Sequence, residues 1–276
     1  MTEKSLWVCL FLLAFASPLL GQNQYTPIAP LPLGDTLLNL STPRVLSRGS
    51  WEVRFTHRFS QPINDGDEHS LWGLDSSADV GFGLSYAPAR DLQLSIFRID
   101  VQDNIEVAAK YVIVQQAPVV PVTLAVRAGV NWRTEENVEE ELSPFVQLLF
   151  SHQIGRKLEF FVMPTYASDV PIDTPTGARF EQVFNIPVGM AVSLKPYLSL
   201  IVELVPHNRD LPEGVESDIG WSIGLKRAIG GHYFEIMLTD TRATNVDQYV
   251  SGGFLGGINA SDIHLGFNIE RRFGGR

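Results

Sequence analysis

VTLAVRAGVNWR, residues 122–133, alternates apolar side chains with polar or small ones at every second position. Successive side chains of a β-strand point to opposite faces, so this stretch predicts a strand with one apolar and one polar face. The same alternation recurs along the chain, and the predicted fold class is therefore all-β. The stretches are 50–60, 78–86, 92–96, 105–113, 122–133, 146–151, 158–165, 184–194, 198–204, 219–226, 233–239 and 263–270.

The connections between these stretches favour a membrane barrel over a soluble sandwich. Long acidic connections lie on one end, whereas the other end has mostly tight turns such as Gly155-Arg156 and Lys195-Pro196. Outer-membrane barrels have long outer loops and short periplasmic turns. We therefore predict a single closed antiparallel transmembrane β-barrel of about 12 strands over residues 50–273. The long connections are 61–77, 134–142, 168–181, 206–217 and 240–260.

Two prolines interrupt the predicted strands. Pro164 and Pro187 lie within or beside the seventh and eighth stretches. Proline cannot donate a ladder hydrogen bond, so we expect these two strands to be bent or bulged.

The polar faces of the strands carry many ions. A dry sandwich core could not hold them, because each unpaired buried charge costs several kcal/mol. The polar face is therefore predicted to line a wet or salt-bridged lumen. The predicted lumen-lining residues are Glu52, Arg54, Arg58, Asp79, Glu106, Lys110, Arg127, Arg133, Glu159, Glu203, Lys226, Glu235, Glu270 and Arg272.

Aromatic residues gather near the strand ends on the apolar face. Trp51, Tyr86 and Phe273 lie toward the turns. Phe59, Trp132 and Trp221 lie toward the long loops. Two aromatic girdles that flank an apolar band are typical of a barrel at its two membrane interfaces.

The N-terminus has the layout of a secretory signal peptide. Lys4 precedes an apolar run that is shorter than the ~18 residues of a spanning helix, and small residues follow. We expect residues 1–21 to be cleaved and residues 22–49 to form an extended N-terminal segment. The one cysteine, Cys9, lies inside the signal, so the mature chain has no disulfide or thiolate chemistry.

Composition limits the partners. The formal charge is −10 over 276 residues, with no Lys/Arg cluster to neutralise phosphates, which excludes a nucleic-acid binder. Export as a barrel predicts contact with outer-membrane lipid and lipopolysaccharide. No cofactor is expected. Ser151 and His152 point to opposite faces of one strand and form no catalytic pair, so we predict no enzyme.

An acidic run follows the fifth stretch. Clustered carboxylates suit Ca²⁺ or Mg²⁺, but the spacing matches no EF-hand loop, and a solvated charge run is the alternative. The candidate ligands of this divalent-cation loop are Glu135, Glu136, Glu139, Glu140 and Glu141.

Several segments resemble the uncharacterised family of bacterial outer-membrane β-barrels catalogued as domain of unknown function 5777. The matching segments are Phe55-Thr56-His57-Arg58-Phe59, Trp72-Gly73-Leu74-Asp75, residues 79–98, residues 230–241 and the ending Gly266-Phe267-Asn268-Ile269-Glu270-Arg271-Arg272-Phe273. The resemblance implies a barrel exported to the outer membrane of a Gram-negative-type cell, with no assigned activity. A last strand that ends in Phe273 also resembles the signal that the barrel-assembly machinery recognises during biogenesis.

Two functions fit these features. The first is a passive pore or substrate-binding channel whose acidic outer rim favours cations. The second is a plugged structural or adhesion barrel, in which inward pairs such as Arg54 and Glu270 close the lumen. A soluble periplasmic β-sandwich or lipocalin-like binding protein is the third alternative.

Overall fold

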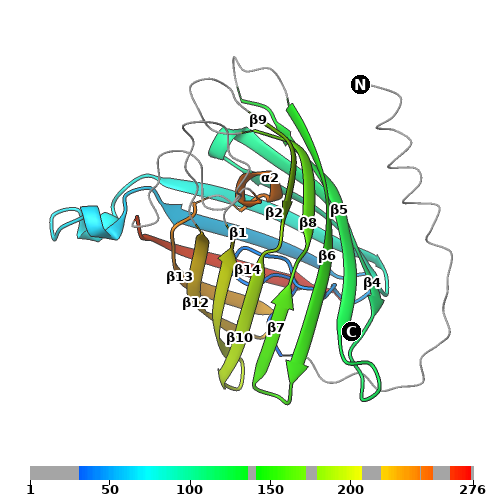
Figure 1. Cartoon of the computed structure of the whole chain (residues 1–276). Coiled ribbons are helices and arrows are strands. Elements are labelled where there is room, and N and C mark those ends of the chain that lie inside the picture. The colour runs from blue at the N-terminus through cyan, green and yellow to red at the C-terminus, as the bar shows by residue number, and fades with distance from the viewer. Residues whose placement is uncertain are drawn as a thin grey trace.

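A computed structural model describes residues 31–135, 141–171, 179–206, 219–242, 244–250 and 262–274. Fourteen antiparallel strands form one sheet, and pairing of β5 with β6 closes that sheet into a ring (Figure 1). The strands of the first half are β1 (Trp51–Phe59), β2 (Ala78–Ala89), β3 (Leu92–Ile99), β4 (Asn104–Val114), β5 (Thr123–Arg133), β6 (Glu141–Ile154) and β7 (Leu158–Val162). Those of the second half are β8 (Thr165–Pro171), β9 (Arg179–Asn185), β10 (Val188–Lys195), β11 (Leu198–Val205), β12 (Gly220–Ile229), β13 (His232–Thr239) and β14 (His264–Phe273).

Twelve positions around the ring accommodate the fourteen strands. β7 and β8 lie end to end along β6, and their partners β10 and β9 lie end to end beside them. Pro164 separates the first pair and Pro187 the second, which is the interruption expected where a ladder donor is missing. The structure thus confirms a closed antiparallel barrel of twelve strand positions with two broken strands.

Register places the charged residues on the inner face. β1 pairs with β14 so that Arg54 lies opposite Glu270, and Arg58 lies opposite Gly266. The outer face is apolar over most strands, with exposed side chains such as Phe82, Ile96 and Ile236. A contiguous exposed apolar belt of this kind is covered by lipid in a membrane barrel.

Short helical segments lie in the connections at the loop end of the barrel. The 3₁₀ turns η1 (Ile63–Asp65), η2 (Leu71–Gly73) and η3 (Val101–Asp103) lie in connections between strands, and α2 (Val246–Tyr249) lies in the β13–β14 connection. Within the described part of the chain, no helix is both long and apolar enough to cross a membrane.

Candidate functional site

The predicted lumen-lining residues all lie on strands, and their side chains are withdrawn from solvent. Four are partly exposed: Arg54, Asp79, Arg133 and Arg272, at 12–27% of their side-chain area. The other ten are buried, which an open aqueous channel would not produce. These are Glu52, Arg58, Glu106, Lys110, Arg127, Glu159, Glu203, Lys226, Glu235 and Glu270.

The chain before β1 covers these residues. We call residues 31–48 the luminal segment; it runs inside the ring of strands (Figure 1, blue). It folds back in a tight hairpin, in which Thr36 pairs with Ser41 and Leu37 N–H donates to Leu40 O at 2.8 Å. Its leucine side chains are at most 5% exposed, so the segment fills the lumen rather than lying across its mouth. They are Leu31, Leu33, Leu37, Leu38, Leu40 and Leu46.

Glu203 on β11 holds the tip of the hairpin. Its carboxylate accepts the backbone N–H groups of Leu38, Asn39 and Leu40 at 2.8–3.1 Å. It also accepts the side-chain amide of Asn39 at 3.1 Å. Successive N–H groups that converge on one anion form a nest, and hydrogen bonds to a charged group are about twice as strong as neutral ones.

A fully buried ion network lies beside the hairpin. Lys226 Nζ lies 2.6 Å from Glu235 and 3.4 Å from Glu270, and all three side chains are 0% exposed. The same ammonium donates to Thr36 O at 2.9 Å and Leu37 O at 3.2 Å. Lys226 therefore pairs with two carboxylates of the wall and binds the luminal segment at once.

Arg54 and Glu270 form the cross-strand pair proposed for a closed lumen. The two residues are direct partners in register, and Arg54 Nε lies 3.5 Å from Glu270 Oε1. Glu270 also accepts the hydroxyl of Thr36 at 2.6 Å. This ion pair is thus connected to the luminal segment as well.

Three carboxylates, of Asp35, Glu52 and Glu270, approach one another within a metal-ligand spacing. Cations already neutralise this cluster, because Arg272 lies 2.5 Å from Glu52 and 3.7 Å from Asp35. Burial alone would raise the pKa of Asp35, but Lys110, Arg272 and a hydrogen bond from Gln93 hold that pKa well below its ordinary value. The cluster therefore serves as an ion network that anchors the luminal segment.

α2 closes the lumen from the loop end (Figure 1). Its four residues are all buried. Val246 N–H donates to Glu106 at 2.9 Å, and the Asp247 carboxylate accepts two hydrogen bonds from Asn104 at 2.8 and 3.0 Å. Arg127 pairs with Glu106 and so lies close to α2. We call α2 the second cover, because it is separate from the luminal segment.

Docking of α2 is expected to weaken as the pH rises. Burial raises the pKa of Asp247 to about 7, with a smaller contribution from Glu106, against an ordinary value of 3.8. The protonated form is therefore favoured in the docked loop, so docking is strongest below about pH 4, weakens as the pH rises from about 4 to about 7, and has lost this contribution above 7. Hydrogen exchange at Val246 and Tyr249, corrected for intrinsic rates, should be faster at pH 8 than at pH 5. Asp247→Asn should remove this difference, and a difference that persists in that variant would contradict the assignment.

Cavities lie beside the luminal segment. One of about 50 Å³ lies between Asn39 of the segment, Tyr249 of α2 and Arg127 of the wall. This volume holds only a few water molecules. Another, of about 530 Å³, opens at the turn end and is lined by Arg44 and Arg90 among others. The interior is thus accessible from the turn end and nearly filled at its centre.

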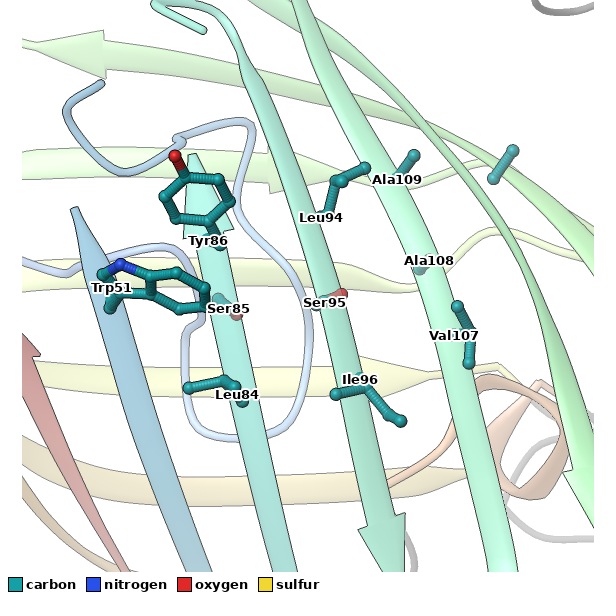
Figure 2. A pocket seen from close by; sticks show the side chains of 11 residues that line it. Trp51, Leu84, Ser85, Tyr86, Leu94, Ser95, Ile96, Val107, Ala108 and Ala109 are labelled. Carbon is teal, nitrogen blue, oxygen red and sulfur yellow. The ribbon is translucent and has the colours of Figure 1, made fainter. Parts of the chain in front are cut away.

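The outer surface carries the predicted aromatic residues in two rows. Trp51 is a direct cross-strand partner of both Phe273 and Tyr86, and it stacks on Tyr86 at 4.1 Å between ring centroids. Phe59, Trp132 and Trp221 lie at the opposite strand ends. The Trp51–Tyr86 stack lines a mainly apolar groove across β1–β5, which has a volume of about 490 Å³. Figure 2 shows the side chains that line it, among them Leu84, Leu94, Ile96 and Val107.

Other predicted features lie at the edge of the structure or beyond it. Residues 1–30 are outside the described residues, as are Glu136, Glu139 and Glu140 of the candidate cation loop. Glu135 follows β5, and Glu141 begins β6 and pairs with Arg133 at 3.6 Å. His152 is exposed whereas Ser151 is buried, so the two occupy opposite faces of β6.

Sequence reasoning missed the apolar part of the inner wall. Leu149, Phe161 and Ile201 are at most 1% exposed and share one buried cluster with the leucines of the luminal segment. Their signal was present in the sequence, because Leu149 and Ile201 each lie between two polar residues of the inward face, and Phe161 follows Glu159 on that face. Large apolar side chains on the luminal face predict that an apolar segment of the chain or an apolar ligand packs against them.

The closed ring, the apolar outer belt and the charged interior define a membrane β-barrel. The chain belongs to the family of membrane-bound beta barrel domains, DUF5777, whose model matches residues 34–273 and so includes most of the luminal segment. No curated protein sequence matches the chain significantly.

The chain is similar to solved barrel structures at low sequence identity, and the fold is shared with the one whose TM-score exceeds 0.5. An outer membrane channel from Pseudomonas putida F1 is 11% identical, with a TM-score of 0.52 over 83% of this chain and 97% of that one. The NanC porin is 14% identical, with a TM-score of 0.48 over 81% of this chain and 99% of that one. Omp33 of Acinetobacter baumannii is 9% identical, with a TM-score of 0.42 over 82% and 98% of the two chains.

Proposed function

We propose that this barrel is an outer-membrane channel that the luminal segment holds closed. The observation that carries the proposal is the binding of three consecutive backbone N–H groups, of Leu38, Asn39 and Leu40, by the single carboxylate of Glu203. The wall ions that would line an open lumen thus serve as ligands for a resident occupant. Displacing that occupant would expose them to water.

The attachments of the segment are of a reversible kind. Arg44 pairs with Glu159 at 2.5 Å, and Arg54 donates to Leu38 O at 2.7 Å, so ions and hydrogen bonds hold it beside its apolar contacts. Cys9 lies in the segment expected to be removed, so no disulfide would fix the occupant in place. A channel needs such reversibility, whereas a permanently closed barrel does not.

The acidic loop end supports a preference for cations. Asp65, Asp67, Glu68 and Asp75 all lie in the β1–β2 connection. A ring of acids raises the local cation concentration at a pore entrance. The same proposal includes location in the outer membrane and cleavage of the signal peptide. It also includes contacts with lipid and lipopolysaccharide, and assembly by the barrel-assembly machinery.

The second candidate is a structural or adhesion barrel that never opens. The buried ion pair of Lys226 and Glu235 favours it, because such a pair would occupy the lumen even in a barrel that transports nothing. Leu71 and Trp72 on the β1–β2 connection favour adhesion, because both side chains are more than half exposed.

A reversible disulfide distinguishes the two candidates. Leu37 Cδ1 occupies the space where a Cβ at Gly189 would lie, so Leu37→Cys with Gly189→Cys brings two thiols within bridging range. In a planar bilayer, the oxidised variant should show no stepwise currents. Reduction should restore currents that reverse at a cation-selective potential in a salt gradient.

The control is Leu37→Cys alone, which should conduct equally with and without reductant. Conductance by the oxidised variant, once mass spectrometry has verified the bridge, would contradict closure by the segment. Silence of the wild type, the reduced variant and the control, all folded by heat-modifiable gel migration, would favour the structural barrel.

A further inference from the structure

Wall side chains bind the luminal segment largely through its main-chain carbonyl groups. Lys110 Nζ donates to Asp35 O and Thr42 O, both at 3.1 Å. Asn268 donates to Leu38 O at 2.7 Å, as does Arg54. Together with Lys226 on Thr36 O and Leu37 O, wall donors engage five carbonyls of this short stretch.

The wall also supplies acceptors for main-chain N–H groups. Glu203 accepts three of them at the hairpin tip, and Gln93 Oε1 accepts Leu46 N–H at 2.9 Å. Donors and acceptors therefore face the segment together. Every peptide has alternating carbonyl and amide groups along its backbone, whatever its sequence. An oligosaccharide of glucose has hydroxyl groups and no such alternating backbone.

The rest of the recognition is aliphatic. Leu33, Leu37, Leu38 and Leu40 enter the buried cluster that includes Phe161 and other wall residues. Gly189 leaves the space that Leu37 Cδ1 fills. Burial of a leucine side chain stabilises a bound peptide, so such side chains would select among peptides that all satisfy the polar groups.

From this arrangement we infer that the lumen is a peptide-binding site, occupied in cis by the luminal segment and built to take peptides with aliphatic side chains in trans. The inference rests on the proposed function, because a ligand enters only when the segment leaves. The segment then acts as a competitor for the site that an incoming peptide uses.

The test uses the full-length Leu37→Asp variant in a planar bilayer. A carboxylate among the buried leucines is unpaired, which disfavours docking of the segment while leaving the wall sequence intact. Three 18-residue peptides are added in turn to the turn side. The first has the sequence of residues 31–48; the second keeps only its four leucines at 33, 37, 38 and 40 among Ser, Thr and Gly; the third replaces those four by Ser. Maltohexaose is the non-peptide probe.

The first two peptides should block the current, and the third should need at least about a tenfold higher concentration, since burial of even one leucine is worth a factor of ten or more. Maltohexaose should not block. Adding Glu203→Gln to the variant should raise the blocking concentration of both effective peptides about 100-fold, because a charged acceptor of three N–H groups is lost.

Block by the first peptide alone would overturn the inference, because the wall would then recognise only its own segment. Equal block by maltohexaose, or no block by any peptide through a conducting variant, would overturn it while leaving the channel in place. A folded but silent Leu37→Asp variant would overturn the channel, and the inference with it. Leu40→Asp replaces Leu37→Asp if the latter fails to fold.

Discussion

Lys226→Met is expected to cost the barrel about 3–5 kcal/mol of unfolding free energy, the range for breaking a buried ion pair by removing one partner. Glu235 would lose the cation with which it pairs, Glu270 would keep Arg54 at 3.5 Å, and neither side chain has solvent to replace Lys226. Methionine has nearly the volume of lysine, so the loss reports charge rather than packing. Urea titration of the refolded protein in micelles, followed by tryptophan fluorescence, measures the effect.

Two further variants show whether charge is the cause. Glu235→Gln in the Lys226→Met background should recover part of the loss, because the carboxylate that lost its paired cation is removed. Lys195→Met, at the exposed β10–β11 turn, should leave the midpoint unchanged. A loss below about 1 kcal/mol for Lys226→Met would mean that the carboxylates are protonated or hydrated in the native barrel.

Glu203→Gln is expected to release the luminal segment without unfolding the barrel. Hydrogen bonds to a charged group are worth about 1.5–3 kcal/mol each, and an amide replaces the charge while turning an N–H₂ group toward N–H donors. A loss of about 3 kcal/mol raises the undocked fraction roughly 100-fold. Trypsin cleavage after Arg44, which pairs with Glu159 in the docked state, should accelerate by a similar factor.

The matched control is Glu106→Gln on β4. Among the described residues, Glu106 bonds to Arg127, Asn131 and Val246 of α2 and to none of the hairpin, so this variant should loosen the second cover while Arg44 stays protected. Equal protection of Arg44 in wild type and Glu203→Gln would contradict the anchoring role of Glu203. Acceleration in both variants would show that the two covers undock together.

Side-chain alternation was enough to predict most of the barrel. A strand has a period of two, so identifying Trp132 as outward fixed Arg127 and Arg133 as inward, and the structure has both on the luminal side. Strand boundaries were harder, because Pro164 and Pro187 break the ladder and turn two predicted strands into four segments.

Occupation of the lumen could not be predicted in the same way. Residues 31–48 have no period, since a hairpin that packs leucines on several sides at once repeats neither every two residues nor every 3.6. Its partners are remote in the sequence: Leu38 binds Glu203, and Thr36 binds Glu270. Local patterns carry no information on such contacts, although Phe161 and Ile201 on an inward face gave an indirect signal.

These remote contacts set the order of assembly. The nest on β11 and the ion network on β12–β14 come after more than 150 residues of chain that separate them from the segment they bind. Loop closure over such distances is slow, and β1 cannot join β14 until the last strand is in place. The luminal segment, which is synthesised before the barrel, can therefore dock only after β11–β14 have formed. Acquisition of protease resistance by Arg44 should be among the final kinetic phases of folding.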